Sequence, residues 1–402
     1  MLAKRLVSTL LIAMLGYGVA RLFGFHDLQD SQPYLLIATV LLAVGLFGST
    51  HEISILDISG NVKLVLTVVT LGVVVKAALV AGVLYAIFRD PAFIVLGVAV
   101  AQIDPLSVAV MRQRSRMSGR AKAILSAWSA FDDPVTAILA VYLSTVALGL
   151  GPSTSNGDHL MGGYSNVGVN VLLNALLVAG VYVAWRLLRT LGDRDRMGMG
   201  SQSWPVWLRV LAVGALLAAG AIAVDGFLML GVALAGLFFR PGIGQVLRGV
   251  TPVAFTVAVL MLGMVLAGGV NLLPGVLLGV SAFAAQAIVG LLIHTRSLLR
   301  GDRLRLALGQ QNGITAIILA LLLETLFPGT IAIVGPAILV INVLHLGSNA
   351  IVDRVEDRRV ATVAASTGSS DLVMSSGIPL MGMDSLLGST PAQAGEGTAT
   401  AA

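Results

Sequence analysis

Two adjacent carboxylic acids, Asp132 and Asp133, lie in an otherwise apolar stretch that runs from Ala123 to Tyr142. If this stretch crosses a membrane as a helix, both acids lie near the bilayer centre, where each costs about 2.5–3.5 kcal/mol on insertion scales. Ionisable side chains at that depth usually mark a place where something charged is bound or moved. The pair therefore predicts a cation or proton site. The alternative is a pair of acids held in salt bridges that serve assembly.

Helix geometry separates the two acids, because adjacent residues on a helix point about 100° apart. Ser126, Ser129 and Thr136 lie on the same helix face as Asp133 by their three-and-four spacing. Asp133 is therefore the predicted primary site, with the hydroxyls of Ser129 and Thr136 as candidate ligands. Both hydroxyls are also within reach of Asp132, so this discrimination is modest.

A third carboxylate, Asp104, precedes Pro105 in another apolar stretch. Proline has no N–H and clashes with the carbonyl four residues earlier, so this helix should break here. Inside a bilayer, freed carbonyls are tolerated only where protein or a water-filled cavity satisfies them, and broken helices coordinate ions in many transporters. Asp104 is thus a second candidate cation ligand. The alternative is a proline kink beside a buried, protonated Asp104.

The sequence from Gly309 to Gly313 places three amide side chains, the last of them Asn312, between two glycines. Such a run is a poor transmembrane helix and predicts a second interruption. Its segment runs opposite to that of Asp104, so half-helix ends of opposite polarity would meet near the midplane. Alternatively, these residues form the polar cytoplasmic end of an unbroken helix.

Lys76 lies well inside a further apolar stretch, too deep for its side chain to reach the interface. It therefore needs a carboxylate or a water-filled space around its ammonium group. Asp132 is the expected partner. The alternatives are a structural pairing with Asp104 or a position closer to the interface.

Isolated polar side chains occur in the later apolar stretches. Gln286 stands alone, whereas Asn342, His345 and Asn349 share one helix face by their spacing. Hydrogen bonding between helices is the expected role of these side chains. Proton relay by His345 is the alternative.

The composition predicts the elements that position these residues. Of 402 residues, 57% are hydrophobic and 11% charged, against about 25% charged in soluble domains. This indicates an all-α polytopic membrane protein with about twelve transmembrane helices, each long enough for a hydrocarbon core about 30 Å thick. No cysteine is present, which excludes disulfides and thiolate metal sites. The apolar segments lie near residues 4–24, 33–50, 61–88, 92–111, 122–149, 167–190, 206–224, 226–240, 250–269, 272–295, 304–325 and 329–352.

The positions of Lys and Arg predict orientation, because these residues favour cytoplasmic loops. They cluster after the fourth, sixth, eighth, tenth and twelfth segments, whereas the intervening loops carry only Arg21 and Arg89. We therefore expect both termini in the cytoplasm, a transmembrane domain over residues 1–355 and a disordered cytoplasmic tail over residues 356–402. Segments three to five run opposite to segments ten to twelve, which is compatible with an inverted repeat.

Asp104-Pro105 on the fourth segment, Asp132-Asp133 on the fifth and the late polar-glycine motif together resemble the bacterial sodium/proton antiporters of the monovalent cation:proton antiporter superfamily. The resemblance implies inverted repeats with two crossed broken helices, the fourth and the eleventh, a dimerisation scaffold and elevator-like alternating access. It also implies that Asp133 binds both the cation and the proton. The broken-helix backbone would then include Pro105, Gly309, Asn312 and Gly313.

In this family the first acid of such a pair often contacts a lysine on the helix equivalent to the tenth segment. Our best placement puts Gln286 at that position, which leaves Asp132 without its usual partner. Lys76, on another helix, is the candidate that compensates the charge of Asp132 instead.

The sequence thus predicts a secondary transporter, not an enzyme, that exchanges Na⁺ or K⁺ for protons across the cell membrane. Cation and proton would compete at Asp133, and Asp104 with freed carbonyls would complete the oxygen shell. We expect no cofactor and no nucleic-acid partner; the chain would lie in a lipid bilayer as a homodimer. The alternatives are a sodium-coupled organic-anion symporter and a cation-binding channel or sensor. An intramembrane aspartyl protease is disfavoured, because the sequence has no Gly-x-Gly-Asp motif.

Overall fold

A computed structural model describes residues 2–25, 28–51, 72–105, 108, 115–150, 167–199, 205–240, 244–292, 298–309 and 312–367. Every regular element within these ranges is a helix, which confirms the all-α class. The elements are α1 (Leu2–Phe23), η1 (Leu28–Asp30), α2 (Gln32–His51), α5 (Val73–Phe88), α6 (Ala92–Val100), α8 (Gly119–Leu150), α10 (Val167–Met199), α11 (Val206–Asp225), α12 (Met229–Phe238), α13 (Gly244–Leu266), α14 (Leu272–Leu292), α15 (Arg300–Ala307), α16 (Ile314–Glu324) and α17 (Thr330–Thr367).

The helices have the length and surface of membrane spans. Within the described residues, 8 helices are long and apolar enough to cross a membrane, and shorter apolar helices accompany them. Large apolar side chains face outward, as at Met14 on α1, which is 69% exposed, and Val210 on α11, which is 64% exposed. Such extended apolar surfaces fit lipid and not water, so the chain is a multi-pass membrane protein. Each of the twelve expected segments contains a described helix. The number of crossings and the orientation of the termini stay predictions.

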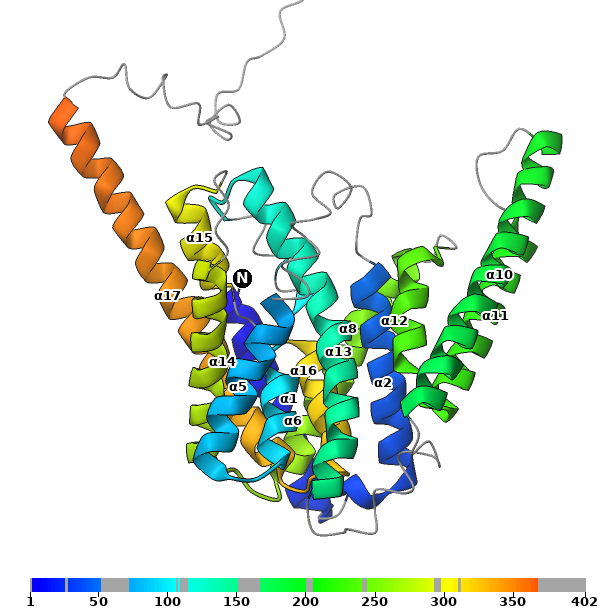
Figure 1. The fold of residues 1–402 in the computed structure, drawn as a ribbon, viewed down its shortest axis with the longest axis horizontal. Helices are drawn as coiled ribbons and strands as arrows, with labels where there is room; N and C mark the ends of the chain where they lie inside the picture. Colours follow the sequence, from blue (N-terminus) through cyan, green and yellow to red (C-terminus); the bar gives the residue numbers. More distant parts are fainter. Residues whose placement is uncertain are drawn as a thin grey trace, which may run out of the picture. The chain divides into compact units, whose positions relative to one another are not determined.

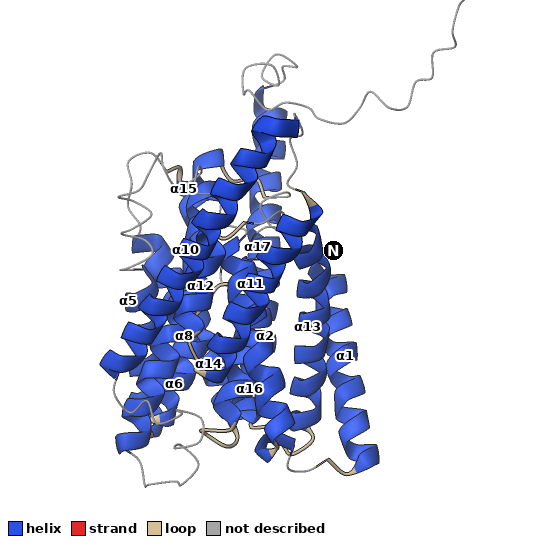
Figure 2. Ribbon diagram, turned by 90° about the vertical axis from the view of Figure 1, so that its right-hand side faces the viewer, coloured by secondary structure: helices blue, strands red, loops and turns tan. Residues whose placement is uncertain are grey.

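Residues 1–349 form one compact unit, in which α6, α8 and α16 lie toward the middle of the bundle (Figure 1 and Figure 2). Glycines allow close helix contacts around this centre. A Cβ on Gly97 of α6 would lie 2.9 Å from the Cα of Ala81 on α5. A Cβ on Gly279 of α14 would lie 2.8 Å from the carbonyl oxygen of Ala337 on α17. Small residues at helix contacts are typical of membrane bundles, and here they pack α6 closely against α5 and α14 closely against α17.

Two of the expected segments are interrupted. In the fourth, α6 ends at Val100 and residues 101–104 are not helical. In the eleventh, α15 ends at Ala307 and α16 begins at Ile314. The α8 helix, which carries both acids of the pair, is continuous from Gly119 to Leu150. Gln310, Gln311 and most of residues 106–114 lie outside the described residues.

The last helix extends further than the sequence suggested. We expected disorder from residue 356 onward, but α17 continues to Thr367, so residues 356–367 are helical. Arg354, Glu356 and Arg358 are good helix formers, and extending an existing helix is easier than starting a new one. Residues 350–402 form a second unit, of which the part after residue 367 lies outside the described residues.

Candidate functional site

Asp132 is the partner of a buried lysine. Its Oδ2 accepts a hydrogen bond from Lys76 Nζ of α5 in an ion pair, and a second one of 2.9 Å from the backbone N–H of Ile103. Both charged side chains are 0% exposed. The ring of Trp128, one turn earlier on α8, has its centre 5.5 Å from Lys76 Nζ. The expected contact between Lys76 and Asp132 is therefore confirmed. One carboxylate oxygen joins α8 to α5 and to the interruption after α6.

Asp133 has different neighbours. Its Oδ2 accepts a 2.7 Å hydrogen bond from the hydroxyl of Thr315, which lies in the first turn of α16. The carboxylate of Asp104 is close enough to Asp133 for the two to interact electrostatically. Asp133 is 0% exposed, and within the described residues its Oδ1 has no hydrogen-bond partner. Two buried carboxylates within electrostatic reach of each other are stabilised when one of them binds a proton or a cation.

Asp104 packs directly against the second interruption. It is the last of the non-helical residues after α6 and is 2% exposed. A Cβ on Gly313 would lie 2.2 Å from Asp104 Cγ and 2.3 Å from its Oδ2. No side chain fits at position 313 unless the carboxylate moves. Glycine at position 313 has no side chain, and this lets the backbone of the second interruption approach Asp104.

A hydrogen bond joins the two interruptions. Asn312 Nδ2 donates to the carbonyl oxygen of Val100 over 2.8 Å. That carbonyl is at the carboxyl end of α6, where the helix provides no partner. Helical structure resumes at Pro105, and the N–H of Val108 donates to the carbonyl of Asp104 over 3.1 Å. The breaks that the sequence predicted are therefore both present and lie against each other.

The hydroxyls predicted beside Asp133 point elsewhere. Thr136 Oγ1 donates to the backbone carbonyls of the two acids over 2.6 and 3.1 Å, and Ser129 Oγ donates to the carbonyl of Ser126 over 3.2 Å. Such local bonds are usual for Ser and Thr inside helices. Thr315, which the sequence analysis missed, supplies the donor to Asp133. Its signal was its place two residues after Gly313, in the first turn of the new half-helix.

Gln286 lies on α14 but contacts the end of α15. Its Nε2 donates to the carbonyl of Leu306 over 3.1 Å. A Cβ on Gly309, beyond that end, would lie 3.2 Å from Leu125 Cδ1 of α8. Gln286 thus satisfies a backbone group near the second interruption, and the charge that compensates Asp132 comes from α5.

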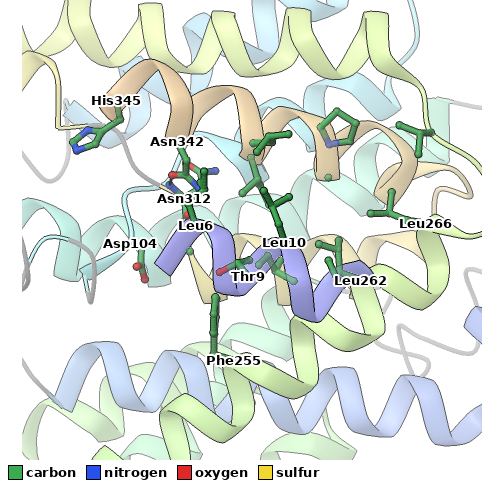
Figure 3. A pocket seen from close by; sticks show the side chains of 18 of the residues that line it. Leu6, Thr9, Leu10, Asp104, Phe255, Leu262, Leu266, Asn312, Asn342 and His345 are labelled. Atoms are coloured by element: carbon green, nitrogen blue, oxygen red, sulfur yellow. Dashed lines mark hydrogen bonds between the residues drawn. The ribbon is translucent and has the colours of Figure 1, made fainter. Parts of the chain in front are cut away.

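A cavity of about 290 Å³ reaches this region from one side. Asp104, Asn312, Asn342 and His345 lie toward one end of it, and most of the remaining wall consists of apolar side chains such as Leu10 of α1 and Leu262 of α13 (Figure 3). The cavity therefore provides space beside Asp104, whereas Asp133 is not among its lining residues.

The fold with these interruptions is similar to a solved transporter structure. It matches the sodium proton antiporter MjNhaP1 from Methanocaldococcus jannaschii, determined at pH 8, with a TM-score of 0.53 and 16% sequence identity. The match covers 87% of this chain and 94% of that chain. No family model and no curated protein sequence matches the chain. The likeness shows the fold, which this chain shares with that antiporter structure.

Proposed function

We propose that the protein exchanges a monovalent cation, Na⁺ or K⁺, for protons across the cell membrane by alternating access. The observation that carries the proposal is the setting of Asp133. It is buried where two interrupted helices meet, lies within electrostatic reach of Asp104, and accepts a hydrogen bond from Thr315. The lysine nearby is engaged by Asp132. The antiporter fold supports the same conclusion.

Competition at one carboxylate is sufficient for coupling. Burial favours the neutral form of a carboxyl group, and a bound cation favours the ionised form. If a cation and a proton exclude each other at Asp133, exposing that site alternately to the two sides of the membrane produces exchange. No separate coupling device is required.

The residues of the site divide into two groups in this mechanism. Asp133 carries the exchanged cation or proton, and Asp104 with backbone oxygens of the interruptions would complete an oxygen shell, which suits hard monovalent cations. Asp132 and Lys76 instead hold α5, α8 and the interruption after α6 together. The proposal includes a homodimer, both termini in the cytoplasm and a transmembrane domain that ends near residue 355.

Replacing the proposed exchange residue tests the function. We expect Asp133→Asn to abolish cation-driven pH recovery in inverted membrane vesicles, because an amide neither ionises nor exchanges a proton. The size of the side chain is retained, so the variant should insert normally, which immunodetection of the membrane fraction checks. Asp225→Asn is the matched control, since this aspartate is exposed at the end of α11.

The same assay separates the alternatives. Exchange without any organic solute excludes an organic-anion symporter, and strict counter-movement of protons excludes a channel or sensor. Wild-type exchange with NaCl and KCl in turn identifies the cation. Unchanged exchange in Asp133→Asn vesicles would overturn the assignment of the site.

A further inference from the structure

Three polar side chains on one face of α17 contact the interrupted backbone between α15 and α16. Asn342, His345 and Asn349 follow the three-and-four spacing of one helix face. Each forms a hydrogen bond to a main-chain group of residues 308–312. Because backbone groups inside a membrane must find partners, this face of α17 does more than attach one helix to another. It provides partners that the missing helical turns cannot.

Asn342 makes the most specific of these contacts. Its Oδ1 accepts from the backbone N–H of Asn312 over 3.3 Å, and its Nδ2 donates to the backbone carbonyl of the same residue over 3.2 Å. One planar amide thus pairs with both main-chain groups of one non-helical residue, as a neighbouring peptide would. This double contact fixes the orientation of the Asn312 backbone as well as its position.

The orientation of Asn312 affects the proposed cation site on both sides. Its side chain donates to the carbonyl of Val100 and so links the second interruption to the end of α6. The next residue, Gly313, packs against the carboxylate of Asp104. A rotation of the Asn312 peptide would therefore move both the bond to α6 and the surface on which Asp104 rests.

His345 and Asn349 act at the other end of the interruption. His345 Nδ1 lies 2.7 Å from the carbonyl oxygen of Leu308, and Asn349 Nδ2 donates to the same oxygen over 3.2 Å. A carbonyl oxygen has two lone pairs and can accept both bonds. These contacts stabilise the end of α15, which is separate from the residues that touch Asp104.

We propose that Asn342 is a positioning residue for the cation site and acts through the backbone of Asn312. The inference rests on the proposed exchange function and adds a residue on α17 that determines cation affinity. It distinguishes Asn342 from His345 and Asn349 on the same face, which contact the carbonyl of Leu308 at the end of α15.

The test measures sodium affinity in two ways for Asn342→Leu. The purified protein in detergent is titrated with NaCl, and the rise in melting temperature gives the sodium midpoint, because a ligand that binds the folded state stabilises it. Exchange in proteoliposomes gives KM and kcat for Na⁺. Each lost hydrogen bond typically contributes about a twofold to tenfold change in an equilibrium, so both the midpoint and KM should rise about tenfold. The rate kcat should change less.

Asn349→Leu is the matched control, because it removes an amide from the same face without touching Asn312. Its sodium midpoint should stay within about twofold of wild type. A lower melting temperature with an unchanged sodium midpoint in Asn342→Leu would show a purely structural role and overturn the inference. Equal shifts in both variants would overturn it as well. Asn342→Ser, which is polar but too short for the double contact, provides the test if the leucine variant does not fold. A wild-type protein that binds or exchanges no cation would instead refute the proposed function itself.

Discussion

Asp132 and Asp133 are neighbours in the sequence and have opposite surroundings in the structure. Asp132 Oδ2 accepts from a lysine and a backbone N–H, whereas Asp133 Oδ2 accepts from one hydroxyl and lies within electrostatic reach of Asp104. Within the described residues the Oδ1 of each acid has no hydrogen-bond partner. The difference arises because one step along a helix turns the side chain by about 100°. The first acid therefore contacts α5 and the interruption after α6, and the second contacts α16. In the proposed mechanism, Asp132 therefore links neighbouring helices, and Asp133 is the acid that exchanges cation and proton.

The charge balance follows the same division. Lys76 forms an ion pair with Asp132. Among the described residues, no cationic side chain forms an ion pair with Asp133. Asp133 is buried within electrostatic reach of the carboxylate of Asp104. A cation or a proton at Asp133 would reduce the repulsion between these two acids. We therefore expect removal of the lysine to lower mainly the stability of the fold, and removal of the donor to Asp133 to lower mainly the affinity for the cation.

The largest expected effect is that of Lys76→Gln. It leaves the carboxylate of Asp132 buried without its cation, and breaking a buried ion pair in this way typically costs about 3–5 kcal/mol. Thermal unfolding in detergent should show a large loss of melting temperature. Lys76 also lies within electrostatic reach of Asp133. Without this positive charge the neighbouring carboxylates bind protons more tightly, so the exchange profile should move to higher pH.

The double variant Lys76→Gln with Asp132→Asn tests whether this ion pair only stabilises the fold or also takes part in exchange. Both charges are gone, the two amides can bond to each other, and the new asparagine oxygen can still accept from the N–H of Ile103. We expect most of the lost stability to return, and exchange to persist. A folded double variant that no longer exchanges would make Asp132 an exchange residue and end the proposed division of roles.

A smaller effect is expected from the hydroxyl on the other side of the comparison. Thr315→Val keeps the shape of the side chain and removes the donor to Asp133 Oδ2. Hydrogen bonds to charged groups contribute about 1.5–3 kcal/mol, so KM for Na⁺ in proteoliposomes should rise at least about tenfold. The melting temperature should change little in comparison with Lys76→Gln.

Thr136→Val is the control for this prediction. Thr136 is also a buried threonine next to the acids, but its hydroxyl donates only to backbone carbonyls of its own helix. Its replacement should leave KM within about threefold of wild type. If the two valine variants behave alike, the bond from Thr315 has no special role in cation binding.

These two threonines also illustrate how far the sequence could lead. Local composition and spacing predicted the apolar segments, the interruptions near Pro105 and at the late glycines, and acids that are buried in the structure. The partner of Lys76 could be predicted too, because a buried lysine requires a carboxylate and few are available. Thr136 was predicted and Thr315 was missed, because helix spacing identifies neighbours on one helix only. The donor to Asp133 comes from a segment far along the chain, and its position depends on how the two interruptions pack.

The end of the chain was missed for a different reason. Residues 356–367 have no apolar face, and we expected disorder there, but helix propensity and the helix that precedes them extend α17 to Thr367. The end of an apolar pattern in a sequence indicates where a helix ceases to be buried. It does not indicate the residue at which the helix ends.

The smallest expected effect concerns Gln286, the residue that the family resemblance placed where a lysine often lies. In the structure its amide bonds to the carbonyl of Leu306, and Lys76 of α5 supplies the charge for Asp132 instead. Gln286→Leu should therefore cost only about 0.5–1.5 kcal/mol, the usual contribution of one hydrogen bond. Exchange rate and the charge moved per cycle, measured in proteoliposomes with and without an imposed membrane potential, should match wild type. A changed charge per cycle in this variant would mean that α14 takes part in compensating the acids. The contrast between Asp132 and Asp133 would then depend on three helices around the site and not only on α5 and α16.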